Sequence, residues 1–232
     1  MATAIPATKH RFEILDIVRG IALLGVLLAN TKGFAGFWTA SDVEKSAMLF
    51  APSEPYLLFL TSAFLDGKFY SLFSLLFGVS FALIISKDGG NRIIFRRLAV
   101  LLLIGLAHAL LLWDGDILVL YAVLGFSLPL FNRLKNKSLL IIAVFLIFSP
   151  ILLDQVRLIN EDGVNPEGPI REMGFSVFAS QINGEPTEGV FITKMKSPGF
   201  INQLEINQVL FFFRWGYLLE SNRLPKVLGL FL

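Results

Sequence analysis

The chain has 232 residues, of which 55% are hydrophobic, and its mean hydropathy is +0.69. This composition exceeds what a folded soluble domain usually tolerates, and the long apolar runs lack the alternation of a membrane β-barrel, so the sequence predicts a helical integral membrane protein. The absence of cysteine excludes disulfides, thiolate catalysis and cysteine metal sites, while the net charge of +2 is less informative than the distribution of Lys and Arg.

The first predicted transmembrane span covers residues 14–34, within the stretch RFEILDIVRGIALLGVLLAN that ends at Asn30. A helix that is apolar on every side needs lipid or a large core around it. At about 100° per residue, Asp16, Arg19 and Asn30 share one stripe, which should face protein or water because lipid cannot solvate it. The opposite stripe consists of small residues that allow another helix to approach closely: Ala22, Gly25 and Ala29.

A second span is predicted at residues 69–86. Before it, the apolar segment 56–65 is too short to cross a bilayer and is expected at the outer interface or as a re-entrant piece. Phenylalanine recurs every fourth residue along the span, and packing or lipid contact is the simplest interpretation of this aromatic ridge: Phe69, Phe73, Phe77 and Phe81. The following loop, KDGGNRIIFRR, is strongly basic, so the positive-inside rule places it and the N-terminus in the cytoplasm.

Further spans are predicted at residues 98–113, 117–131, 139–153 and 201–219. The third and fourth are joined by the tight turn Asp114-Gly115-Asp116, and the fourth and fifth by the basic segment NRLKNK, again cytoplasmic. Residues 154–199 form a polar outer loop, in which FSVFASQI is the piece expected to lie on the bilayer. The sixth span then returns the chain to the cytoplasm at Arg223 and Lys226.

Pro225 opens a further apolar helix, VLGLFL, after which the chain ends at Leu232. Because a crossing needs about twenty residues, the sequence predicts a chain that ends at the start of a seventh span. The predicted fold is therefore all-α. It is one polytopic transmembrane domain over residues 1–232, with about six complete spans, a cytoplasmic N-terminus and a large outer loop between the fifth and sixth spans.

His108 is the residue in the spans that most strongly indicates chemistry, because an imidazole is costly to bury in a membrane and titrates near neutral pH. Asp114 and Asp116 follow it, and either carboxylate could orient the ring, although helical rise places the turn about 9 Å beyond His108. His108 and Asp116 are therefore candidate catalytic residues. The alternatives are a histidine hydrogen-bonded between helices and carboxylates that only form and cap the turn.

Four more residues are candidates for substrate binding. Arg19 precedes Asn30 by eleven residues, as Arg97 precedes His108, so each pair spans about 16 Å along its helix. The two arginines, with Asp16 one turn from Arg19, would attract an anionic donor near the cytoplasm, while Asn30 lies at the depth of His108. A local Asp16–Arg19 ion pair that anchors the helix at the membrane surface, and a coincidental spacing, are the competing interpretations.

Several stretches together resemble the YeiB-like family of bacterial inner-membrane proteins: RFEILDIVRGIALLGVLLAN, GKFYSLFSLLFGVSF, RRLAVLLLIGLAHALLLWDGDILVLYAVLG and LPKVLGLFL. The resemblance implies a multi-pass protein of the bacterial inner membrane, in contact with the lipid bilayer, with further helices after the last of these stretches. Members of this family are sometimes described as transport-related.

The first helix is also similar, more distantly, to the transmembrane acyltransferase superfamily, whose members move acyl groups from a donor such as acyl-CoA to sugars or lipids. One branch carries its catalytic histidine eleven residues after an arginine of the first helix. Arg19 matches that arginine, and Asn30 stands at the position of the histidine. The heparan-α-glucosaminide N-acetyltransferase branch resembles LD-x-x-RG-x-AL with Asn at this point and places its histidine shortly afterwards, where this chain has none before His108.

Two functions follow from these candidates. In the first, acyl-CoA is the cytoplasmic donor and His108 is the general base for an acceptor hydroxyl or amine at the outer side. In the second, the chain is a transporter or permease in which His108 carries a proton. A membrane scaffold without a site is the third hypothesis. The sequence has no Rossmann, phosphate-loop or metal-site signature, and we expect no metal, no permanently bound cofactor and no nucleic-acid partner.

Overall fold

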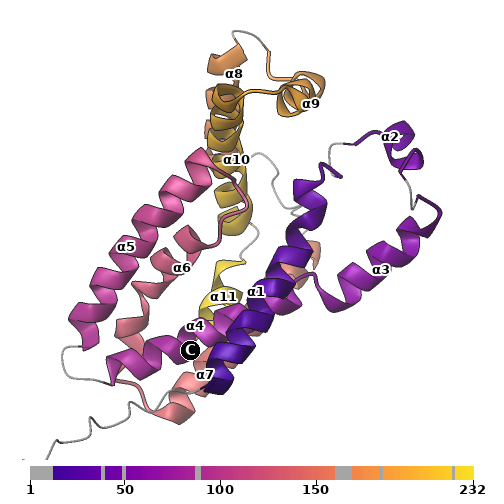
Figure 1. Cartoon of the computed structure of the whole chain (residues 1–232). Helices are drawn as coiled ribbons and strands as arrows, with labels where there is room; N and C mark the ends of the chain where they lie inside the picture. The colour runs from indigo at the N-terminus through magenta and orange to yellow at the C-terminus, as the bar shows by residue number, and fades with distance from the viewer. Residues whose placement is uncertain are drawn as a thin grey trace, which may run out of the picture.

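The computed structural model of the chain describes residues 13–37, 40–48, 51–86, 90–159, 169–182, 185–220 and 223–232. The regular structure of these residues is entirely helical, which confirms the predicted all-α class (Figure 1). The longer helices are α1 (Glu13–Phe34), α3 (Glu54–Phe64), α4 (Lys68–Ile85), α5 (Gly90–Leu111), α7 (Asn136–Ile159), α8 (Pro169–Ile182) and α10 (Phe200–Glu220). The shorter ones are α2 (Asp42–Ser46), α6 (Leu118–Gly125), α9 (Glu188–Lys196) and α11 (Leu224–Phe231), with 3-10 turns η1 (Ala51–Ser53) and η2 (Leu128–Phe131).

Four of the described segments are long and apolar enough to cross a membrane: Glu13–Phe34, Ala51–Ile85, Gly90–Leu111 and Asn136–Val156. They overlap the first, second, third and fifth predicted spans. The fourth predicted span, residues 117–131, corresponds to the shorter apolar segment Leu118–Phe131, which combines α6 with η2. Apolar helices of this length indicate a membrane protein.

Small residues determine how closely α1 approaches α4. Ala22 and Gly25 of α1 are buried, and a side chain at Gly25 would collide with the ring of Phe69. The small stripe predicted from the sequence therefore forms a helix–helix contact. The other members of the aromatic ridge on α4 pack against the central core: Phe73, Phe77 and Phe81.

The central core forms where α11 packs against both α4 and α7. Pro225 lies in the first turn of α11, as the sequence predicts, and Phe231 near its end is buried against Tyr121 of α6. Two glycines permit this close approach. Gly78 of α4 meets the backbone of Phe231, and a Cβ added at Gly229 would lie 2.7 Å from a carbonyl oxygen of α7.

The two ends of the helix bundle differ in their charged residues. The end where α5 and α7 begin is named here the basic end, after its cations: Arg92, Arg96, Arg97, Lys135 and Lys137. The end where α5 and α7 finish and α4 begins is named the acidic end, after its carboxylates: Asp66, Asp114, Asp116 and Asp154.

Residues 201–219 fold as α10, which is not among the four segments of the described chain that are long and apolar enough to cross a membrane. Arg214 lies 3.8 Å from Asp114, and Arg223, just beyond α10, lies 3.4 Å from Asp154. Arg223 and Lys226, which the sequence predicts in the cytoplasm, both line a cavity beside Asp116 at the acidic end. Helix α10 lies with α8 and α9 (Figure 1). Its first half is too polar for a lipid-facing helix: Asn202, Gln203, Glu205, Asn207 and Gln208.

The predicted outer loop, residues 154–199, contains substantial helix. Helix α7 continues to Ile159, and both α8 and α9 follow before α10. The segment FSVFASQI belongs to α8, where Phe178 is buried and the ring centroid of Phe175 lies 4.9 Å from that of Phe213 on α10. Phe175 therefore contacts α10 and Phe178 packs against Phe191 of α9, where the sequence suggested contact with the bilayer.

Candidate functional site

A histidine and an aspartate meet at the acidic end. His108 lies in the last turn of α5, and its Nδ1 is 3.1 Å from Oδ1 of Asp116. The sequence estimate of about 9 Å from His108 to the turn assumed that the helix continues to the end of the predicted span, at residue 113. It ends at Leu111 instead, and the backbone N–H groups of Leu112 and Trp113 both donate to the carbonyl of His108. This closure folds the turn back onto the ring.

Asp116 is almost completely buried and uses both of its oxygens. Its side chain is 2% exposed; Oδ1 faces His108 and Oδ2 accepts the backbone N–H of Val119 at 2.8 Å. Asp116 thus bonds to the start of α6 and contacts the imidazole at the same time. With Nδ1–H donated to the carboxylate, Nε2 of a neutral His108 becomes the acceptor nitrogen. The His108 side chain is 35% exposed, so a ligand can reach the ring.

A polar cleft of about 650 Å³ opens beside this pair. Helix α1, the turn after α5 and helix α10 supply most of its walls, and its lining mixes amide, charged and aromatic side chains: Asn30, Trp113, Asp114, Gln203 and Arg214. The predicted substrate-binding residue Asn30 is therefore in the cleft. Trp113 links the cleft to the histidine, because its ring lies edge-on to His108, with centroids 6.4 Å apart, and 4.6 Å from Phe34.

Asp114 and Arg214 face each other across the cleft wall. Their closest atoms are 3.8 Å apart, which is a loose ion pair. Burial raises the pKa of Asp114, and the positive charge of Arg214 offsets this only in part. Arg214 also lines a second cavity of about 200 Å³ that reaches Asp116. The sequence analysis missed Arg214 because it assigned the helix that carries it to a membrane crossing.

The other predicted binding residues lie at the basic end, with one partner that the sequence analysis missed. Arg19 donates to Asp16 at 2.9 Å and to the hydroxyl of Ser80 on α4 at 2.5 Å. Ser80 and Arg97 line the same cavity of about 220 Å³. The candidates thus divide into two groups: Asp16, Arg19 and Arg97 at the basic end, and Asn30, His108 and Asp116 at the acidic end. Ser80 is one of three serines in α4, and nothing in the sequence distinguished it from Ser71 and Ser74.

The break between α3 and α4 also contributes a contact at the acidic end. Lys32, near the end of α1, lies 2.8 Å from Asp66 and 3.4 Å from the hydroxyl of Thr61. Gly67 has φ +76°, a left-handed conformation that permits the turn into α4. The turn between α3 and α4 therefore also connects α1 to the second hydrophobic segment, through the ion pair of Lys32 and Asp66.

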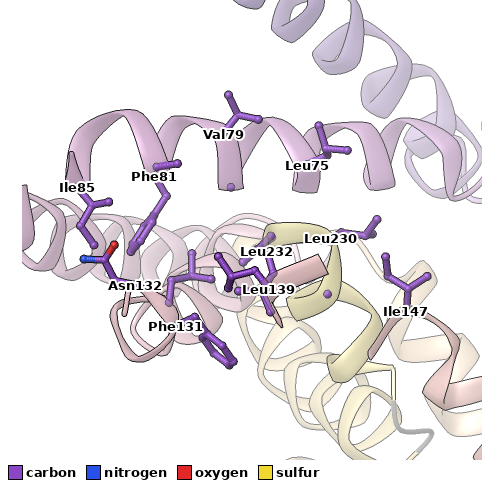
Figure 2. Close-up of a pocket in the computed structure, with 15 residues that line it drawn as sticks. Leu75, Val79, Phe81, Ile85, Phe131, Asn132, Leu139, Ile147, Leu230 and Leu232 are labelled. Carbon is purple, nitrogen blue, oxygen red and sulfur yellow. The ribbon is translucent and has the colours of Figure 1, made fainter. Parts of the chain in front are cut away.

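A further cavity, of about 380 Å³, is almost wholly apolar. Figure 2 shows Leu75 and Val79 of α4 on one side, Leu230 and Ile147 on others, and Asn132 at one end. Since its walls offer a single polar side chain, this cavity has packing character and supplies no catalytic groups.

The chain is similar to three bacterial proteins. It is 36% identical over 170 residues to the uncharacterized protein YxaH of Bacillus subtilis, a match that covers 63% of this chain and 39% of YxaH. It is 39% identical over 127 residues to the uncharacterized protein YeiB of Escherichia coli, covering 50% of this chain and 30% of YeiB. It is also 32% identical over 156 residues to an uncharacterized 39.9 kDa protein in the amylase 3′ region of Bacillus acidopullulyticus, covering 65% of this chain and 42% of that protein.

The matched segments span less than half the length of each of these relatives. No family model matches the chain, and no solved structure matches it. None of the three printed names states an activity. The similarities support a relationship between this chain and the YeiB-like proteins.

Proposed function

We propose that the chain is part of a YeiB-like multi-pass protein of the bacterial inner membrane, with its basic end in the cytoplasm. Four helices of sufficient length and the cations at one end of the bundle support this orientation. Residues 1–232 then form one transmembrane helical domain in which α6 and α11 complete the core. Helices α8, α9 and α10 lie at the outer face, next to the cleft.

The activity we propose is acyl transfer at the acidic end, and the contact between His108 and Asp116 is the observation that carries it. An oriented imidazole whose second nitrogen is an acceptor is the arrangement of a general base. Nε2 takes the proton of an acceptor hydroxyl or amine, and the acceptor atom bonds to the acyl carbon. The carbon–sulfur bond of the thioester donor then breaks, and the proton passes from Nε2 to the departing thiolate. Buried Asp116 stabilises the imidazolium between these steps.

The basic end would hold the donor. Arg19 and Arg97 would attract the phosphates of acyl-CoA, and Asp16 would hold the Arg19 side chain in place. Helical rise separates Arg97 from His108 by about 16 Å, so the donor would extend along α5 with its acyl group toward the acidic end. Asn30, which lines the cleft, would hold the acyl or acceptor oxygen.

A proton-linked transporter is the second proposal, and the division of the polar residues favours it. Both α1 and α5 carry an arginine at the basic end and a polar residue at the acidic end, which suits a route between the two membrane faces. In that case His108 takes up a proton at the acidic end and transfers it during transport.

The test compares wild-type protein with His108→Asn in the intact protein after reconstitution into vesicles. Asn keeps a neutral hydrogen bond of similar shape but cannot act as a base near neutral pH. Acyl transfer predicts that consumption of labelled acyl-CoA is abolished while folding is nearly intact. Transport predicts that proton coupling is lost while solute exchange persists. Full activity of His108→Asn in both assays would remove His108 from the functional residues.

A further inference from the structure

Three cationic side chains gather at the end of the bundle where the membrane orientation does not call for them. Arg214 of α10, Arg223 before α11 and Lys226 of α11 line one cavity of about 200 Å³ at the acidic end. The positive-inside rule accounts for cations at the cytoplasmic end of a membrane protein. With the basic end in the cytoplasm, these three lie at the opposite face, so topology does not explain them.

The charge inside this cavity is predominantly positive. Its lining contains those three cations and a single carboxylate, Asp116, both of whose oxygens already accept from His108 and Val119. Two further carboxylates face the arginines from outside the lining. Asp114 is 3.8 Å from Arg214, and Asp154 is 3.4 Å from Arg223.

These two separations exceed the 2.7–2.9 Å of a strong charge-assisted hydrogen bond. The guanidinium groups therefore have donors available for a closer anion. At about 30 Å³ per water molecule, a cavity of about 200 Å³ holds roughly the volume of six waters, which is enough for a phosphate group. Two planar guanidinium forks and one ammonium suit the several oxygens of a phosphate better than a single-point acceptor.

We propose that Arg214, Arg223 and Lys226 form a binding site for the phosphate group of a ligand, next to the carboxylate that orients His108. The site stands independently of acyl transfer, since a transporter would use it equally. The phosphate belongs either to a lipid head group at the outer membrane surface or to a soluble phosphorylated molecule.

The test measures binding of dodecyl phosphate to the intact protein in an uncharged maltoside detergent by calorimetry. Lys226→Gln should weaken binding about tenfold, and Lys226→Arg, which keeps the charge, should bind nearly as well as wild type. Lys226 is a cleaner target than the arginines, which also face carboxylates. Lys68→Gln is the matched control, because Lys68 is at the same end but bonds to the carbonyl of Ser62 outside the cavity.

Competition distinguishes the two sources. If inorganic phosphate displaces dodecyl phosphate, the phosphate group alone is recognised and a soluble ligand is indicated; if only dodecyl phosphate binds, a lipid head group is indicated. His108→Asn should bind as wild type does, so a failure of the proposed catalysis leaves this result unaffected. The proposal is overturned if wild type does not bind, or if Lys68→Gln weakens binding as much as Lys226→Gln.

Discussion

The core around α11 and the acidic end use polar groups in opposite ways. In the core, the ring of Tyr121 contacts Phe73, Phe77 and Phe231, with centroids 5.1–5.8 Å apart. Its hydroxyl is 2.7 Å from that of Ser74, which in turn bonds to a backbone carbonyl of its own helix. At the acidic end, a cleft of about 650 Å³ lies between polar side chains. Two ion pairs there have long separations, of 3.4 and 3.8 Å.

This difference indicates where the chain keeps its capacity to bind. A polar group whose hydrogen bonds are satisfied inside the protein contributes to stability and has little left for a ligand. Groups that face a cleft with long contacts remain available. The apolar cavity near the core offers hydrocarbon side chains instead, such as Leu75, Val79 and Ile147 (Figure 2). Steric changes should therefore dominate the response of the core, and changes of charge that of the acidic end.

The largest expected effect is steric, at the crossing of α4 and α11. Gly78→Val would place a branched side chain against the backbone of Phe231, which cannot move as a flexible side chain could. Overpacking of this kind costs about 3 kcal/mol or more. Thermal unfolding in detergent, followed by circular dichroism, should show a large loss of stability or failure to fold.

Gly20→Ala is the matched control for that substitution. Nothing lies within 4 Å of a Cβ built at Gly20, which is also within a helix. It should raise stability slightly, because Ala is favoured over Gly in a helix by about 0.5–1 kcal/mol. A Gly78→Val protein as stable as the Gly20→Ala protein would show that α11 does not pack against α4.

Tyr121→Phe should have the next largest effect. It keeps the aromatic contacts of the core and removes the hydroxyl that meets Ser74. Loss of a buried hydrogen bond costs about 1–2 kcal/mol, and the same unfolding measurement should detect it. Ser74→Ala should cost a similar amount, and the double variant should cost less than the sum because both remove one contact. Additive effects would contradict a shared hydrogen bond.

Much of this architecture is readable from local sequence. The apolar segments, the small stripe with Gly25 and the helix start at Pro225 all depend on residues close together in the chain, and the structure has each of them. The position of α10 depends on a partner instead. The sequence predicts a span at residues 201–219, and in the structure Asn207 is fully buried and Phe213 meets α8. No pattern within α10 identifies α8 as the helix that covers it.

The candidate site shows the same limit. His108 and Asp116 were recognisable as residues, because a membrane span rarely carries such groups without a reason. Their direct contact depended on where α5 ends, and helix ends are poorly specified by sequence. Arg214, Arg223 and Lys226 carried no signal beyond charge, and the cavity that they share depends on how α10 and α11 pack.

At the acidic end, Asp114→Asn should alter the dependence of stability on pH. Burial raises the folded-state pKa of Asp114 above its ordinary value of 3.8. The stability linked to its proton is thus present below that value and is lost as pH rises through the folded pKa. At pH 7 the Asn variant should unfold at a slightly higher temperature than wild type, and the difference should shrink as the pH approaches 3.8.

Asp66→Asn is the control for that experiment. Asp66 lies 2.8 Å from Lys32, so its removal should lower stability at pH 7, by less than about 1 kcal/mol for a partly exposed pair. The two variants should therefore shift the unfolding temperature in opposite directions. If Asp114→Asn lowered it as Asp66→Asn does, the loose Asp114–Arg214 contact would be a stabilising ion pair and the contrast with the core would weaken.

The smallest expected effect concerns the exposed periphery of the acidic end, where Lys196 of α9 donates to both oxygens of Glu44 on α2, at 2.8 and 3.2 Å. These bonds, with those from Ser41, lower the pKa of Glu44 to about 2. The contact is therefore present above the ordinary value of 4.5 and is lost as pH falls through about 2. Glu44→Gln should leave the unfolding temperature unchanged and raise amide hydrogen exchange in α2 and α9 at pH 7.

Gln can retain the capping box that Glu44 forms with Ser41, so the substitution isolates the charge-dependent bond to α9. Lys45→Gln on the same short helix should leave exchange in α9 as in wild type, because Lys45 lies over the ring of Phe37. Faster exchange in α2 alone would mean that Glu44 only caps its own helix. Faster exchange in both helices would mean that a single ion pair at the rim links segments 152 residues apart, while the core beneath it does not respond.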